Sequence, residues 1–251
     1  MKKLKGILLD IQKLESTASV LQWDQETYMP EGGGAFRAEQ LAFLSLLTHQ
    51  MATGDKIKDE LSRHIDYKTG NFVNITMNDK EKRLVYLAWK DLKKLSNLPG
   101  HFVEEMSKHV SKSQQAWIKA RKNDDFPSFA PYLEKMISLK KQEAEYYSYK
   151  DKPYDALLDQ FEPGMTTERI GALFGELKTP LVNLVDRINA QPQIDTSLLQ
   201  QKFDTKEQWA FGMKIAEAMG LDMTRARQDV SAHPFTTGFH PDDVRITTRL
   251  N

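Results

Sequence analysis

The chain contains no cysteine among its 251 residues. Disulfide bonds, thiolate nucleophiles and cysteine-based zinc sites are therefore excluded, and a reducing compartment suits the protein. The sequence also lacks net charge, because 35 basic residues balance 35 acidic ones. Proteins held on nucleic acid or on a membrane surface by bulk charge carry an excess of Lys and Arg. We therefore expect neither nucleic acid nor a membrane as a partner.

Long apolar runs are missing as well. The apolar segment Ile7–Leu9 is broken at once by Asp10, so we expect no signal peptide, and no window approaches the length of a membrane span. The sequence also has no repeat of fixed period, no low-complexity tract and no long linker. We therefore expect a cytoplasmic protein that forms a single domain over residues 1–251.

Most of the chain carries apolar residues at spacings of three and four, the period of an amphipathic helix. In the first such segment, Leu4, Leu8 and Ile11 lie on one face, and the pattern stops near residues 23–26. Further helices are expected from about Ala35, over 57–65, from Asn78, over 101–122, from about Asp125 to Tyr149, over 154–161, from Thr166 or Thr167, and over 209–219.

Several helix boundaries have explicit signals. Asn78 followed by Glu81 forms a capping box, and Thr205 followed by Gln208 forms a second one. Gly220 is placed to end the last helix. Pro180 lies inside the long helix that begins near Thr166, so we expect a kink or a break there.

The C-terminal stretch from His233 has a different pattern. Val244, Ile246 and Thr248 alternate with Arg245, Thr247 and Arg249, which is typical of a β-strand. A turn is expected around Gly238, His240, Pro241 and Asp242. We expect strand character only after Ala232, and we expect the final strand to need a partner for its backbone groups, as in a piece of a larger protein.

With no Cys, only carboxylates and His are plausible catalytic groups. His101, Glu105 and His109 are spaced by four residues on one expected helix, a pattern that could hold zinc or a two-metal centre with help from a second helix. A solvated helix face is the alternative, and we favour it because Lys and Glu residues surround the three.

Two N-terminal features admit both functional and structural interpretations. The segment Trp23–Glu26 could line a cleft, but we favour a buried Trp23 with Asp24 or Gln25 bonding free backbone groups at the helix end. The run Gly32–Gly34 could bind an anion at a helix start, but a flexible turn is the simpler interpretation.

The strand near the C-terminus carries the remaining candidate site. Asp243, Arg245 and Thr247 share one face of that strand, because alternate residues project together. Asp243 and Arg245 could form an ion pair of little consequence. Alternatively, Asp243 holds the planar guanidinium ready to receive a carboxylate. The spacing alone leaves both interpretations open.

Four stretches together carry a family resemblance. They are WDQETYMPEGGGAFRAEQLAFLSLL from Trp23, YDALLDQFEPGMT from Tyr154, His-Pro-Phe at 233–235, and Asp-x-Arg-x-Thr at 243–247 followed by Thr-Arg. They span nearly the whole chain. With them, the sequence resembles the carboxypeptidase Taq family of thermostable metallocarboxypeptidases.

The resemblance implies a mainly α fold, an elongated multi-helix array that forms half of a groove, with a short β-hairpin near the C-terminus. It also implies a peptidase that removes single residues from peptide C-termini with zinc or cobalt and that commonly forms a homodimer. In the family, the His-Pro-Phe and Asp-x-Arg-x-Thr motifs line or support the groove. The implied substrate-binding residues are His233, Pro234, Phe235, Asp243, Arg245 and Thr247.

The family's metal-binding His-Glu-x-x-His helix follows the Asp-x-Arg-x-Thr strand, and this sequence ends at Asn251, with Leu250 where a Tyr is typical. We therefore expect no catalytic residue, metal ligand or cofactor in this chain, and no hydrolysis by the chain alone. The expectation is the N-terminal part of a metallocarboxypeptidase, as a shortened gene product or as an isolated part of one. The alternative is a non-catalytic helical module that binds peptides or protein partners.

Overall fold

The computed structural model describes residues 1–250, which form two compact units. The first unit comprises Met1–Leu139 and Leu221–Arg249, and the second comprises Lys140–Gly220 together with Leu250. The expectation of one domain over residues 1–251 stays a prediction.

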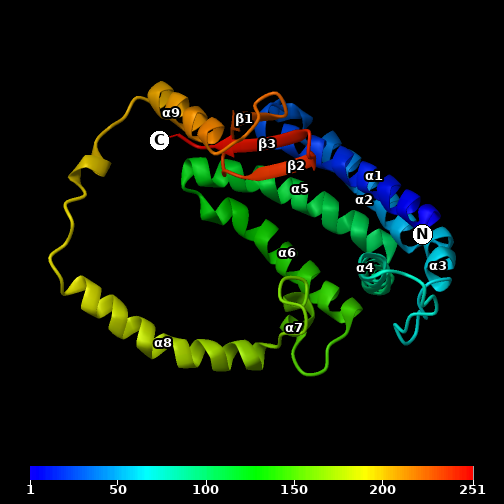
Figure 1. The fold of residues 1–251 in the computed structure, drawn as a ribbon. Coiled ribbons are helices and arrows are strands. Elements are labelled where there is room, and N and C mark those ends of the chain that lie inside the picture. The colour runs from blue at the N-terminus through cyan, green and yellow to red at the C-terminus, as the bar shows by residue number, and fades with distance from the viewer. Residues whose placement is uncertain (251) are drawn as a thin grey trace. The chain divides into compact units, whose positions relative to one another are not determined.

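The first unit is built mainly from helices (Figure 1). The central helix α2 packs against both α1 and α5, while α3 packs against α1, α2 and α4. The sixth helix begins in the first unit and ends in the second. Their bounds are α1 Lys2–Thr27, α2 Gly34–Thr53, α3 Asp55–Ser62, α4 Asp79–Leu95, α5 Gly100–Asn123 and α6 Phe126–Tyr147.

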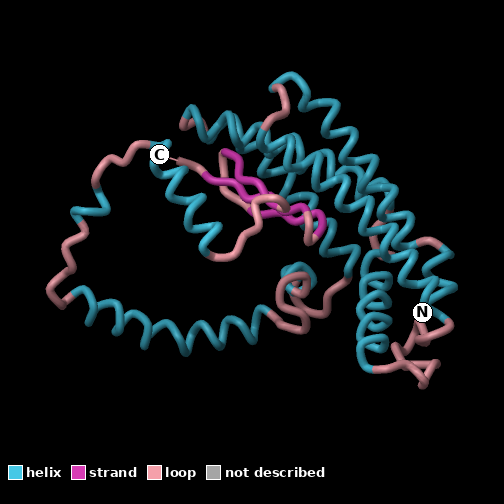
Figure 2. Tube along the Cα trace, turned by 45° about the horizontal axis from the view of Figure 1, so that its top comes forward, coloured by secondary structure: helices cyan, strands magenta, loops and turns pink. Residues whose placement is uncertain are grey.

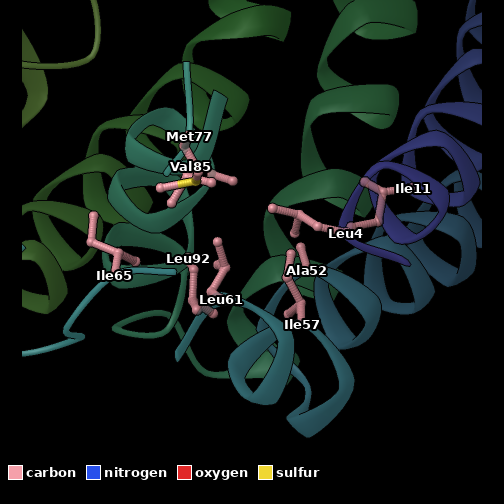
Figure 3. Close-up of a cluster of buried hydrophobic side chains, with 10 residues drawn as sticks. Leu4, Ile11, Ala52, Ile57, Leu61, Ile65, Met77, Val85 and Leu92 are labelled. Carbon is pink, nitrogen blue, oxygen red and sulfur yellow. The ribbon is translucent and has the colours of Figure 1, made fainter. Parts of the chain in front are cut away.

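A core of buried apolar side chains joins the first four helices (Figure 3). It forms because each helix presents one apolar stripe, as the spacing of Leu4 and Ile11 on α1 predicts. The loop between α3 and α4 adds Ile65 and Met77. The members from the helices are Leu4, Ile11, Ala52, Ile57, Leu61, Val85, Ala88 and Leu92.

The capping box predicted at the start of α4 is confirmed. The side chain of Asn78 accepts from the backbone N–H of Glu81 at 3.0 Å, and the backbone N–H of Asn78 donates to the Glu81 carboxylate at 3.2 Å. Two backbone donors that the helix itself leaves unpaired are thereby satisfied.

A three-stranded sheet completes the first unit (Figure 2). Its strands are β1 Ala226–Val230, β2 Thr236–His240 and β3 Asp243–Thr248, in the spatial order β1-β3-β2. The predicted hairpin of β2 and β3 is confirmed, although Gly238 and His240 lie within β2 rather than in its turn.

The first strand was missed from the sequence, because Ala226–Val230 reads Ala-Arg-Gln-Asp-Val and shows no apolar alternation. It pairs with β3 in parallel. The expectation that the final strand still needs a partner is therefore wrong, since β3 is central and bonds to a neighbour on each side.

The second unit contains α7 Pro153–Leu158, α8 Thr167–Asn189 and α9 Thr205–Ala218. Thr166 caps α8 as predicted, but Asp204 rather than Thr205 caps α9. The eighth helix runs through Pro180 without a break. Within residues 1–250, no helix is both long and apolar enough to cross a membrane.

Candidate functional site

One face of the sheet carries most of its charged side chains. Asp243, Arg245 and Thr247 share this face, as the alternation predicts, and Arg227 on β1 lies directly beside Arg245 in the parallel register. Asp229 follows two residues after Arg227 and belongs to the same face. We call Arg227, Asp229, Asp243, Arg245 and Thr247 the charged face.

The side chain of Arg245 is held on several sides. Its Nε donates to Oδ1 of Asp243 at 2.7 Å, and its Nη2 donates to Oδ2 at 3.2 Å. Its Cζ lies 4.7 Å from the ring centre of Trp23 and 5.4 Å from that of Phe239. The ion pair expected from the sequence is therefore present, and it fixes the plane of the guanidinium between aromatic rings.

A second arginine cluster on β1 was missed by the sequence reasoning. Arg227 Nε donates to Oδ2 of Asp229 at 2.8 Å, and Nη2 donates to Oδ1 at 2.6 Å and to the Tyr28 hydroxyl at 2.9 Å. That hydroxyl in turn donates to Asp229. The Cζ of Arg227 lies 5.2 Å from the ring centre of Trp23, so both arginines contact the same indole. The signal was weak because nothing in the sequence links Tyr28 to residues about two hundred positions later.

The pKa of Asp229 reflects opposing influences. Burial by itself raises the pKa of this carboxyl group, whose residue is only 3% exposed. The hydrogen bonds from Arg227 and Tyr28 and the nearby charges of Arg227 and Arg245 outweigh burial, so the pKa lies below its ordinary value. Asp229 is therefore a buried carboxylate stabilised by its donors.

Thr247 holds the His-Pro-Phe segment in place. Its buried Oγ1 accepts from the backbone N–H of Phe235 at 2.8 Å and from the Ser231 hydroxyl at 2.7 Å. Its backbone N–H donates to the Phe235 carbonyl at 2.8 Å. The hydroxyl of Thr247 is therefore engaged within the protein, and its contribution to a site is to position the segment from His233 to Phe235.

His233 and Pro234 are exposed at the end of this segment. Arg121 on α5 donates to the carbonyl of Ala232 at 3.1 Å, and the rings of His233 and Trp117 lie 6.3 Å apart. The segment thus rests on α5. Beside it lies an open cavity of about 340 Å³, lined by Val110, Ser113, Gln114, Trp117, Phe129, Met136 and His233.

The end of α1 joins these parts together. Trp23 is buried as expected, but the expectation that Asp24 or Gln25 bonds free backbone groups through its side chain is wrong. Asp24 pairs with Arg37 on α2 at 2.7 Å. Gln25 accepts from Ser111 on α5 at 2.6 Å. Each of these side chains therefore reaches a different helix.

Glu26 extends the same polar network. Its carboxylate accepts from Gln114 on α5 at 2.9 Å. Burial raises the pKa of Glu26, and the hydrogen bond from Gln114 and the nearby His233 offset only part of that rise. The end of α1 thus connects the cavity side of the unit with the charged face of the sheet.

The hypothesis of a metal site at His101, Glu105 and His109 finds no support. The Nε2 atom of His109 lies 2.9 Å from the Tyr132 carbonyl, and Glu105 pairs with Lys135 at 2.6 Å. Across residues 1–250, no three His, Asp or Glu side chains come together in a way that could hold an ion.

Comparison with known proteins gives one consistent result. The model of the family described as carboxypeptidase Taq (M32) metallopeptidase matches residues 3–251. Carboxypeptidase 1 of Bacillus subtilis is 32% identical over 251 residues, which cover 100% of this chain and 49% of that protein. Thermostable carboxypeptidase 1 of Pyrococcus furiosus is 36% identical over 234 residues, which cover 92% of this chain and 46% of that protein.

Solved structures agree with the sequence comparisons. The crystal structure titled BsuCP matches with a TM-score of 0.91 and 31% identity, over 100% of this chain and 49% of the other. The carboxypeptidase structure from Pyrococcus furiosus matches with a TM-score of 0.79 and 34% identity, over 99% of this chain and 50% of the other. The predicted mainly helical fold with a small sheet near the C-terminus is thereby confirmed.

The chain spans about half the length of the curated relatives that it matches. The similarity offers no support for the alternative of a non-catalytic interaction module. The match over residues 3–251, the identities above 30% and the shared fold lead to one conclusion. This chain belongs to the carboxypeptidase Taq (M32) metallopeptidase family.

Proposed function

We propose that residues 1–251 form the substrate-binding part of a metal-dependent carboxypeptidase that releases C-terminal amino acids from peptides. The observation that carries this proposal is the fixed guanidinium of Arg245 in a chain of this family. Asp243 binds one edge of that guanidinium, and the rings of Trp23 and Phe239 lie within 5.4 Å of it. A group that is already oriented loses little entropy when it binds a ligand.

An exopeptidase must recognise one free carboxylate and reject a chain that continues beyond it. Arginine suits this task, because two parallel N–H groups match the two oxygens of a carboxylate. In this proposal Arg245 receives the C-terminal carboxylate of the peptide and Asp243 orients Arg245. Thr247 positions the segment His233, Pro234 and Phe235 beside the bound peptide.

The remaining features of the proposal rest partly on family membership and partly on the balanced charge and composition of the chain. The metal is zinc or cobalt, and its ligands and the catalytic carboxylate belong to a part of the protein outside residues 1–251. The helices described here form one side of a groove that holds the peptide. The protein works in the cytoplasm as a homo-oligomer, commonly a homodimer, and binds neither nucleic acid nor membranes.

The proposal is tested by replacing Arg245 in the intact peptidase that carries this sequence. Arg245→Ala should lower kcat/KM for peptides with a free C-terminus. The loss should correspond to about 1.5–3 kcal/mol of transition-state stabilisation, the size of a hydrogen bond to a charged group. Amidated versions of the same peptides, already poor substrates, should change little. Arg249→Ala is a matched control, because Arg249 is exposed on the same chain segment.

A thermal melt of each variant separates recognition from folding. If Arg245→Ala weakens acid and amide peptides equally and lowers the melting temperature, Arg245 has a structural role and the proposed recognition is wrong.

A further inference from the structure

The two arginines of the charged face have more donors than the protein uses. A guanidinium has five N–H groups. Arg227 donates from Nε and Nη2 to Asp229 and Tyr28. Arg245 donates from Nε and from one N–H of Nη2 to Asp243. Among residues 1–250, the Nη1 atom of neither arginine has a protein acceptor.

A third donor at this place is also unused. The indole Nε1 of Trp23 is buried and has no hydrogen-bond partner within the described part of the chain. Buried indole N–H groups normally have a partner. Trp23 contacts the guanidinium groups of both Arg227 and Arg245. Donors therefore outnumber acceptors around this ring, which favours a ligand that supplies acceptor oxygens.

The positions of the two arginines add a second argument. Arg227 and Arg245 are register partners on neighbouring parallel strands, so their side chains leave the sheet on the same side. Like charges placed directly opposite each other on a sheet are destabilising. Asp229 and Asp243 compensate this repulsion, but each of them engages only one edge of its arginine.

Exposure distinguishes the two arginines. The side chain of Arg227 is 47% exposed, whereas that of Arg245 is 20% exposed. The more accessible arginine is therefore the one on β1, outside the Asp-x-Arg-x-Thr motif. Tyr28 and Asp229 hold it from the protein side and leave its Nη1 free.

We propose that Arg227 is a second carboxylate-binding residue, which together with Arg245 binds the C-terminal carboxylate of a bound peptide. The carboxylate accepts hydrogen bonds from the guanidinium groups of both Arg227 and Arg245. Tyr28 and Asp229 act as positioning residues that fix the guanidinium of Arg227. This inference rests on the proposed function, and it makes the selectivity for a free C-terminus depend on both arginines.

The inference is tested directly on the 251-residue chain by NMR. The Nε–Hε signals of the arginines are assigned with Arg227→Lys and Arg245→Lys, each of which removes one signal. The ligands are N-acetyl-alanyl-phenylalanine and its C-terminal amide. With the free acid, the Arg227 and Arg245 signals should shift with a common Kd. With the amide, both should stay in place.

Arg227→Lys should raise the Kd of the free acid at least about tenfold, because it keeps the charge but loses the fork that matches a carboxylate. Arg225→Lys is the matched control, since Arg225 is also exposed and paired with aspartates near the start of β1. It should leave the Kd unchanged.

Each result separates the inference from the proposed function. If the Arg245 signal shifts with the acid while the Arg227 signal does not, Arg227 is only a structural ion-pair partner and the inference is overturned, while the proposed function stands. If neither signal shifts, both are overturned. If Arg227 responds equally to acid and amide, it does not bind the carboxylate and the inference is also wrong. The titration of the unmodified chain decides between these results even if a variant fails to fold.

Discussion

Replacing Thr247 by Val should weaken the attachment of the His-Pro-Phe segment to the sheet, although the backbone bond from Thr247 N–H to the Phe235 carbonyl remains. The two side chains have nearly the same shape, so the change removes a hydroxyl group without opening a cavity. The lost hydroxyl is the acceptor for the backbone N–H of Phe235 at 2.8 Å and for the Ser231 hydroxyl at 2.7 Å. The first loss matters most, because Ser231 keeps a second acceptor in the carbonyl of His233 at 2.8 Å.

The expected loss of stability follows from the hydrogen bonds that Thr247→Val removes. A buried donor left without an acceptor costs about 1–3 kcal/mol. The Phe235 N–H is only partly buried, so water recovers part of this energy, and we expect the folded first unit to lose about 2 kcal/mol. Thr247→Ser keeps the hydroxyl and should cost less than Thr247→Val, although it removes a methyl group.

Hydrogen exchange of the Phe235 amide is the most direct assay. A loss of about 2 kcal/mol corresponds to exchange roughly thirtyfold faster, since 1.4 kcal/mol is tenfold. Thr248→Val makes the same substitution on the next residue, whose hydroxyl has no protein partner within residues 1–250, and should leave the Phe235 rate unchanged. Equal rates in Thr247→Val and Thr248→Val would refute the positioning role of the Thr247 hydroxyl.

Two further predictions concern the loop between α3 and α4 and the end of α1. Gly70→Ala should lower the free energy of unfolding by about 1–3 kcal/mol and therefore the melting temperature, because Gly70 has a φ of +74° and a Cβ there would lie 2.6 Å from Cη2 of Trp89. Gly6→Ala is the control and should not lower the melting temperature, because a Cβ at Gly6 on α1 would meet open space. Burial raises the pKa of the Glu26 carboxyl group in the folded state. The protonated carboxyl group therefore contributes to the stability of the fold, and this contribution is complete below the ordinary pKa of 4.5 and is lost as pH rises through the raised pKa. Relative to Glu26→Gln, the unmodified chain should therefore lose melting temperature as pH rises above 4.5, and parallel profiles would contradict this.

The sequence predicted those features that depend on local pattern. The helices follow from apolar spacing, the cap at Asn78 follows from its own residues, and the face shared by Asp243, Arg245 and Thr247 follows from the period of a strand. In each case the physical cause lies within a few residues. The ion pair between Asp243 and Arg245 belongs to the same class, because its partners are two residues apart.

The sequence did not predict features that depend on distant contacts. The first strand has the residues Arg227, Gln228 and Asp229 in succession, which looks like a solvated loop. It becomes a strand because β3 supplies its backbone bonds and because Tyr28, 201 residues away, bonds to Asp229. Tertiary contacts thus override the weak local preference of this segment.

The same reasoning explains why the motif residues alone do not define the site. Arg245 is largely buried, and burying a guanidinium is costly unless it is paired. Asp243 supplies the pairing from within the motif, but the ring over the guanidinium belongs to Trp23, at the other end of the chain. Trp23 also contacts Arg227, so one aromatic ring couples the arginine of the motif to an arginine outside it. The charged face therefore depends on both α1, which supplies Trp23, and the sheet, which supplies the two arginines.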